Sequence, residues 1–247
     1  MNDSHTPITA VICALDEERS IGEVIQGCAN HVDEILVIDG HSVDRTVTVA
    51  TQLGAKVIVD QQKGKGAAIR ESIQHVRSDI VVFIDADGSH DPDDIPKLVR
   101  PILEDDADHV SGSRQLGGSS ELHGGFDECL RLMGSSFITA CINWKFRVRL
   151  SESQNGFRAI RRSVLASLGL VENITTIEQE MIMKTLQQGF RMAEVPTHEH
   201  MRRFGDSHIR VSRVAHRYVW TLMKYCLFAT RRIQPRKRAS HEARAYS

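Results

Sequence analysis

The sequence predicts an α/β fold in which a mostly parallel sheet is flanked by helices and followed by a C-terminal amphipathic helical segment. Two patterns predict it: short apolar runs alternate with amphipathic stretches, and the runs end in turn residues or carboxylates. The clearest run, residues 81–84 (VVFI), leads straight into Asp85-Ala86-Asp87 and then Gly88. Such a run is typical of a strand buried on both faces, so its end lies at the carboxyl edge of a parallel sheet, where open α/β folds bind ligands.

The apolar runs predict the strands in chain order. The first strand, residues 8–15 (ITAVICAL), is followed by acids at 16–18, which suit the first turn of a helix. A turn-rich stretch, residues 151–156, leads into residues 157–160, which we assign to no strand. The other strands are predicted at residues 34–39, 56–60, 79–84, 108–113 and 191–196.

Helices are predicted between these strands and after the last one. Asp44 or Ser42 caps the second helix, Pro92 opens the fourth, and Gly189 is placed to end the helix before the last strand. Residues 116–125, rich in glycine and serine, predict a loop. The predicted helices cover residues 16–28, 44–53, 66–76, 92–103, 127–145, 177–188 and 209–232.

Length and charge limit the domain organisation and the partners. A chain of 247 residues suits one large domain with a short appendage, which we place at residues 1–208 and 209–247. The net charge of −1 gives no global field that would attract nucleic acid. Acids crowd residues 85–108, whereas residues 202–238 are strongly basic. This asymmetry is typical of a metal site in one place and a contact with an anionic surface in another.

The cysteines and the N-terminal residues bear on location. An odd number of widely spaced cysteines without a CxxC pair indicates neither a disulfide framework nor a zinc site. The polar start, MNDSHTP, lacks an apolar signal core, and no stretch approaches the ~18 apolar residues of a membrane span. We therefore expect a cytoplasmic protein. The five cysteines are Cys13, Cys28, Cys129, Cys141 and Cys226.

Carboxylates stand at or just after the ends of three of the predicted strands. They are Asp16 or Glu17 after the first, Asp39 after the second and Asp85 after the strand at 79–84. Because the carboxyl ends of parallel strands meet at one crevice, we expect these acids to lie together. Asp85 and Asp87 project from the same side of an extended chain, so they can share one divalent cation or divide between a cation and a ribose. Mg²⁺ or Mn²⁺ suits such oxygen ligands. The alternative is that both acids are turn or cap carboxylates before the next helix.

The segment KGKG, residues 63–66, precedes another helix. Its glycines and Lys65 would let backbone amides approach a phosphate. It lacks the GxxxxGK[ST] and GxGxxG patterns, so a tight turn into the helix remains an equal alternative.

The longer motifs together carry a family resemblance. In chain order they read ALDEE, VIDGHSVDRT, KGKGAA, DADGSHDP, SGSR, QNGFRAIRR, EQEM, EVP and RRFGDSH. This series resembles the family-2 glycosyltransferases with the GT-A (Rossmann-like) fold, and more narrowly the dolichyl-phosphate mannose synthase group and related polyprenyl-phosphate hexosyltransferases. The resemblance covers residues 8–209 and implies a metal-dependent hexosyltransferase whose GT-A domain is residues 1–208.

The resemblance implies a role for each matching position. The nucleotide pocket would consist of Ala14, Leu15, Glu17, Asp39 and Lys65. The metal–diphosphate would be held by Asp85 and Asp87, with Ser89 as a third ligand. Phosphate groups of donor or acceptor would be gripped by Arg114, Arg131, Ser135 and Arg202. In EQEM, Glu180 would orient the sugar.

Three departures from the family pattern leave the base and the sugar open. Where the family has PxYNE, this chain has Cys13-Ala14-Leu15-Asp16-Glu17, which removes a tyrosine that stacks on the base. Where the family has DDGS, this chain has Asp39-Gly40-His41-Ser42, which removes one acid. The SK pair of the family is replaced by Ser207-His208. The donor can be GDP-mannose, UDP-glucose or a UDP-N-acetylhexosamine.

The implied reaction moves a hexose from the nucleotide to the phosphate of a membrane polyprenol, with inversion of the anomeric centre. The acceptor is already an anion, so the reaction needs positive charge more than a strong base. Arg114, Arg131 and Arg202 would supply that charge if they gather on one face.

Residues 211–230 combine an apolar stripe at helical spacing with Arg213, Arg217 and Lys224. Such a helix either lies in the headgroup region of an anionic membrane or packs on the domain or on a membrane-protein partner, and the sequence leaves these options open.

Two other functions remain possible from the sequence. A glycosyltransferase acting on a saccharide hydroxyl would use a carboxylate such as Glu180, although the QxxRW box of such enzymes is absent. A catalytically inactive binding subunit with the GT-A fold is disfavoured because Asp85 and Asp87 are both present.

Overall fold

The computed structural model describes residues 5–61, 64–120, 126–201 and 211–227. The strands of these residues are β1 (Ile8–Ala14), β2 (Glu34–Asp39), β3 (Lys56–Val59), β4 (Ile80–Asp85), β5 (His109–Ser113), β6 (Arg158–Arg161) and β7 (Met192–Pro196). The helices are α1 (Ile21–Cys28), α2 (Thr46–Gln52), α3 (Lys65–His75), α4 (Ile95–Leu103), α5 (Arg114–Gly117), α6 (Phe126–Phe146), α7 (Arg162–Ser167), α8 (Thr176–Gln187) and α9 (Val211–Leu227). A 3-10 turn, Pro92–Asp94, precedes α4.

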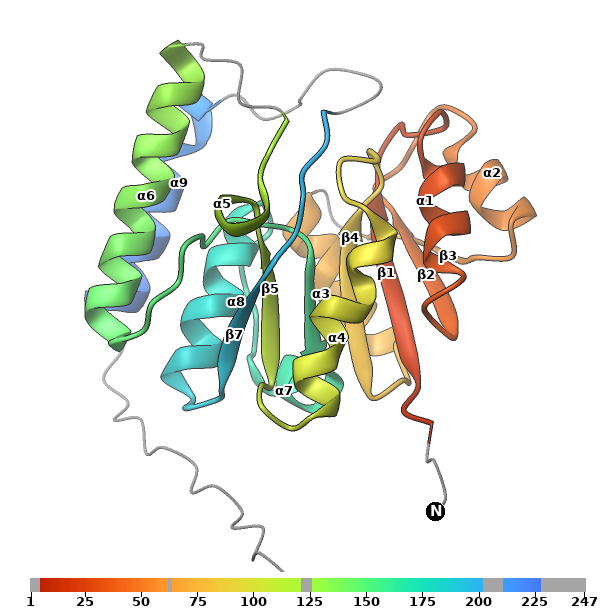
Figure 1. The fold of residues 1–247 in the computed structure, drawn as a ribbon. Coiled ribbons are helices and arrows are strands. Elements are labelled where there is room, and N and C mark those ends of the chain that lie inside the picture. Colours follow the sequence, from red (N-terminus) through yellow and green to blue (C-terminus); the bar gives the residue numbers. More distant parts are fainter. Residues whose placement is uncertain (1–4, 62–63, 121–125, 202–210, 228–247) are drawn as a thin grey trace, which may run out of the picture.

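The strands form one sheet in the order β3-β2-β1-β4-β6-β5-β7 (Figure 1). The pairs among β1, β2, β3 and β4 are parallel, as is the pair of β5 with β7. The predicted mostly parallel sheet is therefore confirmed. The exception is β6, which runs antiparallel between β4 and β5. Its sequence, RAIR, has an arginine at each end, so a search for apolar runs assigns it to no strand.

Helices cover both faces of the sheet, as the unbroken apolar runs predict (Figure 1). On β4, Val82 and Ile84 belong to a core cluster that includes residues of α1 and α4. The alternate residues Val81 and Phe83 pack with residues of α3, α7 and α8 on the opposite face. The central strands are thus buried on both sides, which leaves the strand ends as the places where polar groups meet solvent.

The parallel strands bring their carboxyl ends to one edge. In the register of the sheet, Ala14 of β1 pairs with Asp39 of β2, and Cys13 of β1 pairs with Asp85 of β4. The end of β1 therefore lies between the two strand-end acids, and the predicted convergence of these carboxylates at one edge is confirmed.

The first helix begins later than predicted. Asp16 has a φ of 55°, in a left-handed region that an α-helix does not use, and its Oδ1 accepts a hydrogen bond from the Val43 N–H (2.7 Å). The Glu17 N–H donates to Thr46 Oγ1 at 2.8 Å. The acids after β1 thus join its loop to the loop after β2, and α1 starts only at Ile21. The predicted helix stop at Gly189 is confirmed, because this glycine has a φ of 77° directly after α8.

The C-terminal helix α9 packs on the domain beside α6 and α8 (Figure 1). Leu222 and Tyr225 of α9 are buried in a third apolar cluster with residues of those helices. The Gln187 side chain donates to the Tyr225 carbonyl at 2.9 Å. Of the two options left open for this segment, packing on the domain is what the described part of the helix shows. No helix among the described residues is both long and apolar enough to cross a membrane.

Candidate functional site

The carboxyl edge of the sheet holds a three-residue charge cluster. Lys65 Nζ, at the start of α3, lies 2.7 Å from Oδ1 of Asp85 at the end of β4 and 2.6 Å from Oε1 of Glu178 on α8. Burial would raise the pKa of Asp85, but Lys65, with help from His90, holds it below its ordinary value. Burial opposes the charge of Lys65 as well, yet Asp85 and Glu178 raise its pKa above the usual range. Lys65 and Asp85 are therefore both charged at neutral pH.

Gly156 gives this cluster its space. A Cβ at this position would lie 2.6 Å from Lys65 Nζ, 2.7 Å from Asp85 Oδ2 and 3.2 Å from Glu178 Oε1. Such distances are shorter than side chains tolerate, so only glycine lets the loop before β6 approach the three charges this closely.

The turn after β4 carries the other predicted metal ligands. Oδ1 of Asp87 accepts hydrogen bonds from the Ser89 N–H (3.0 Å) and from Ser89 Oγ (2.7 Å). His90 follows, with Nε2 3.9 Å from Asp85 Oδ2 and its ring stacked on Phe157 at 5.1 Å. The turn thus presents Asp87 and Ser89 together and places a histidine beside Asp85.

The oxygen atoms of Asp85, Asp87 and Ser89 fit the manner in which proteins hold Mg²⁺. The described residues contain no group of three or more His, Cys, Asp or Glu side chains able to hold a metal ion. Mg²⁺, however, is usually held by one or two carboxylates, with substrate phosphates and water completing the shell. Two carboxylates and a hydroxyl therefore suit a cation that arrives with a diphosphate.

The nucleotide-binding residues predicted from the resemblance surround the end of β1. Asp39 is 2% exposed, and its Oδ2 accepts the N–H groups of His41 and Ser42, both at 3.1 Å. Ala14 is its partner in the sheet, and the following Leu15 is 42% exposed. The Glu17 side chain accepts a hydrogen bond from Ser20 Oγ at 3.1 Å. The structure brings Ala14, Leu15, Glu17 and Asp39 to one edge, with Lys65 beside Asp85.

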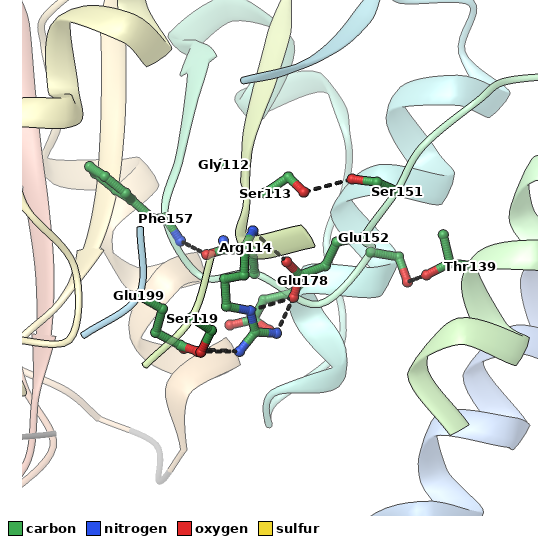
Figure 2. Close-up of polar contacts among 12 residues, drawn as sticks. Gly112, Ser113, Arg114, Ser119, Thr139, Ser151, Glu152, Phe157, Glu178 and Glu199 are labelled. Carbon is green, nitrogen blue, oxygen red and sulfur yellow. Dashed lines mark hydrogen bonds and ion pairs between the residues drawn. The ribbon is translucent and has the colours of Figure 1, made fainter. Parts of the chain in front are cut away.

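Arg114 has two carboxylate partners, which the sequence did not predict. Figure 2 shows its guanidinium between Glu152 and Glu199. Nε donates to Glu152 Oε1 at 2.6 Å and Nη1 to Glu199 Oε1 at 2.9 Å. Although burial opposes it, these carboxylates raise the pKa of Arg114 above its ordinary value. This guanidinium joins the start of α5 to the loop before β6 and to the segment after β7, and its predicted contact with a phosphate stays a prediction.

Glu180 lies apart from the charge cluster. It is fully buried, and its carboxylate accepts the N–H groups of Val171 and Glu172, at 2.8–3.0 Å, and the Tyr225 hydroxyl at 2.5 Å. Lys184 pairs with it at 2.8 Å. Glu180 thus holds α8 to α9 and to the loop before α8, whereas Glu178 contacts Lys65. The predicted role of Glu180 in orienting the sugar stays a prediction.

The remaining predicted phosphate contacts stay predictions. Ser135 is half-buried on α6. Arg131 belongs to the same helix, but its side chain lies outside the described residues, as does the whole of Arg202.

Sequence reasoning missed Glu178, Gly156 and Arg158. Glu178 and Glu180 belong to one motif but are about 200° apart around a helix, so their side chains leave the helix on opposite faces. Arg158, 1% exposed, donates to the Glu178 carbonyl at 3.2 Å and also to the Asn155 carbonyl. The QNGFRAIRR motif holds both Gly156 and Arg158, but nothing in its pattern tells that it lies against Asp85.

Comparisons with known proteins agree with this geometry. The family model described as "Glycosyl transferase family 2" matches residues 9–169. Glycosyltransferase AglJ of Haloferax volcanii is 30% identical over an alignment of 201 residues. The match covers 77% of this chain and 63% of AglJ. The chain thus spans less than two thirds of that relative's length.

A second relative carries a more specific name. It is the UDP-N-acetylglucosamine–dolichyl-phosphate N-acetylglucosaminyltransferase of Methanococcus voltae, which is 31% identical over an alignment of 183 residues. The match covers 65% of this chain and 72% of that protein. Among solved structures, glucosyl-3-phosphoglycerate synthase from Mycobacterium tuberculosis, in complex with Mn²⁺, UDP-glucose and phosphoglyceric acid, matches with a TM-score of 0.75 at 24% identity. The match covers 93% of this chain and 87% of that one and shows a shared fold.

Proposed function

The chain belongs to glycosyl transferase family 2 and is a glycosyltransferase, and we propose that it moves a hexose from a nucleoside-diphosphate sugar to the phosphate of a dolichyl-type polyprenyl lipid. The anomeric centre is inverted, because the acceptor oxygen displaces the diphosphate in line. The Methanococcus voltae relative is named for transfer to dolichyl phosphate, which supports a lipid phosphate over other acceptors. The narrower likeness to the dolichyl-phosphate mannose synthase group is part of the same proposal.

One observation carries the choice of acceptor. Four carboxylates around this edge are already paired with cations: Asp85 and Glu178 with Lys65, and Glu152 and Glu199 with Arg114. A carboxylate whose oxygens already contact a cation is poorly placed to take a proton from an attacking hydroxyl. A sugar hydroxyl needs a base, whereas a phosphate monoester is an anion at neutral pH. The site therefore suits a phosphate acceptor.

Asp85, Asp87 and Ser89 would hold Mg²⁺ or Mn²⁺, which when bound supplies positive charge to the departing diphosphate. The Mn²⁺ and UDP-glucose bound in the structural relative from Mycobacterium tuberculosis support the same cofactor and donor class. Lys65 keeps Asp85 ionised and oriented for this task. Asp39 and the loop after β1 take the nucleoside, and the sugar lies toward Glu178.

We place the enzyme on a membrane surface because α6 and α9 expose large apolar side chains. On α6, Met133, Phe137 and Trp144 share one face by their spacing, and Trp144 is 83% exposed. On α9, Trp220 and Met223 are exposed as well. Exposed aromatic residues on two neighbouring helices are typical of a surface that another apolar phase covers.

The charge around these side chains favours an anionic lipid surface over a second copy of the chain. Lys145, Arg147 and Arg149 are exposed at the end of α6, Arg217 is exposed on α9, and the sequence of α9 contains no acid. Two copies joined through these helices would bring like charges together, whereas anionic headgroups attract them. The enzyme would then be peripheral, on the cytoplasmic face, where its acceptor lipid is present.

The test combines a product assay with lipid binding. The purified chain is incubated with Mg²⁺ or Mn²⁺, each candidate sugar nucleotide and three acceptors: a short polyprenyl phosphate, 3-phosphoglycerate and a saccharide. Mass spectrometry should find the hexosyl lipid phosphate as the main product, and transfer only to the saccharide would refute the proposal. In sedimentation with anionic vesicles, Trp144→Ser should reduce the fraction of bound protein, because it removes an exposed apolar contact. Dimerisation without lipid binding would refute the membrane assignment.

The second candidate is transfer to a small phosphorylated acid. The structural relative with phosphoglyceric acid favours it, because that acceptor also carries a phosphate. The acceptor comparison above separates the two, since a water-soluble acid would then be used better than the lipid.

A further inference from the structure

His41 holds a backbone conformation that side chains rarely adopt. Its φ is 69°, in the left-handed region, where the Cβ of any residue but glycine meets the backbone. Asp16, on the facing loop, has a φ of 55°. The two loops are joined by the hydrogen bond from the Asp16 N–H to Ser42 Oγ at 2.9 Å. Strained non-glycine residues gather at sites where the surrounding structure holds them for a function.

The strained turn lies directly against the buried Asp39. The His41 N–H donates to Asp39 Oδ2 at 3.1 Å, so the conformation of His41 and the position of this carboxylate depend on one another. The other oxygen of Asp39, Oδ1, is buried and has no hydrogen-bond partner among the described residues. An acceptor without a donor is costly inside a protein, and a ligand N–H or O–H would satisfy it.

Two exposed side chains belong to the segments that adjoin Asp39, the turn after β2 and the loop after β1. The His41 side chain is exposed, and no hydrogen bond or ion pair joins it to another described residue. Leu15, which lies against Gly40, is 42% exposed. An apolar side chain and a planar ring next to one buried acceptor make a place for a flat, partly polar group such as a nucleobase, because aromatic rings stack on bases.

We infer that His41 contacts the base of the bound nucleotide and helps to set which base the enzyme accepts. This inference rests on the nucleotide-sugar part of the proposed function. The base lies at the end of β2, beside Asp39, whereas the diphosphate lies at the end of β4, beside Asp85. The two parts of the donor are therefore recognised by separate residues and can be tested separately.

The experiment measures binding of UDP, GDP and pyrophosphate, each with Mg²⁺, by calorimetry on the full chain. His41→Asn and His41→Gly remove the ring but tolerate the left-handed conformation. Val43→Asn, at a 92% exposed position of the same loop, is the matched control. Both His41 variants should weaken the preferred nucleoside diphosphate at least about fivefold, the loss expected from one stacked base. Pyrophosphate binding, and all binding by Val43→Asn, should stay unchanged.

The melting temperature gives a second measurement, in which His41→Gly should change stability in the opposite direction to nucleotide affinity. Because glycine relieves the strain at this position, His41→Gly should raise the Tm by about 2–4 °C while it weakens nucleotide binding. Unchanged nucleotide affinity in both His41 variants, or an equal loss for pyrophosphate, would overturn the inference. If the wild-type chain binds the nucleotide and the variants lose affinity but no sugar reaches a lipid phosphate, the proposed acceptor fails and the role of His41 stands.

Discussion

Replacing Gly156 with alanine perturbs the charge cluster with one methyl group and no change in charge. The added Cβ would lie 2.6 Å from Lys65 Nζ and 2.7 Å from Asp85 Oδ2, whereas ordinary contacts begin near 3.4 Å. The ammonium must therefore retreat by about 0.8 Å and the carboxylate by about 0.7 Å, as the distances grow from 2.6 and 2.7 Å to 3.4 Å. Neither is free to do so, because Lys65 is held by Asp85 and Glu178 together.

The cost of this displacement has two parts. Lengthening the 2.7 Å contact of Lys65 with Asp85 by about 0.8 Å weakens it by about 1.4 kcal/mol at an effective dielectric constant of about 20. Overpacking adds roughly 1–3 kcal/mol. We expect a total loss of roughly 2–4 kcal/mol, which lowers the Tm of a chain of this size by roughly 5–15 °C.

The assay compares the Tm and the affinity for UDP or GDP with Mg²⁺ in Gly156→Ala, wild type and Gly134→Ala. A Cβ at Gly134, on α6, meets nothing within 4 Å, so this control should bind as wild type does and melt no lower. Gly156→Ala should bind at least about tenfold more weakly, because Asp85 is moved from the place proposed for it beside the diphosphate. Wild-type affinity and Tm in Gly156→Ala would refute the packing of the three charges around this glycine.

Three further outcomes are expected. Asp87→Ala should abolish sugar transfer and weaken Mg²⁺–nucleotide binding while the Tm changes little; full transfer activity would contradict its place in the metal site. Arg114→Met should destabilise the chain by about 3–5 kcal/mol in chemical denaturation, since it leaves Glu152 and Glu199 buried without their cation. A variant as stable as wild type would contradict the structural role of this arginine. Burial holds the pKa of His109 well below 6.5, so below pH 6.5 the unfolded chain binds a proton that the folded chain excludes. The free energy of unfolding should then fall by about 1.4 kcal/mol per pH unit as the pH drops below 6.5. His109→Gln, whose amide can replace the contact with Thr185, should flatten this slope. An identical slope in both proteins would show that another group causes it.

The sequence was most informative where one physical effect acts alone. The apolar runs that became β1, β2 and β4 are buried on both faces, so hydrophobic pattern by itself located them and the acids at their ends. β6 was not predicted because its two arginines are accommodated by tertiary contacts: Arg158 by backbone carbonyls and Arg161 by Asp105 and Asp108.

The charged residues show where sequence reasoning ended. The motifs of the family include Arg114 and Glu180, but a motif does not specify which side chain a charged residue pairs with in the fold. Arg114 meets Glu152, 38 positions along the chain, and Glu180 meets Tyr225, 45 positions along. Both pairings depend on how α5 and α8 pack on the rest of the fold, which no local pattern contains.

The central claim is that an oxygen of a lipid phosphate, assisted by the cation site at Asp85 and Asp87, attacks the sugar. The most direct measurement uses a short polyprenyl phosphate whose phosphate oxygens are ¹⁸O, and follows the product by ³¹P NMR. We expect a Mg²⁺-dependent hexosyl phosphate with ¹⁸O in the bond to the anomeric carbon and an anomeric configuration opposite to that of the donor. Retained configuration, or labelled lipid phosphate that stays unglycosylated while donor is consumed, would contradict the account.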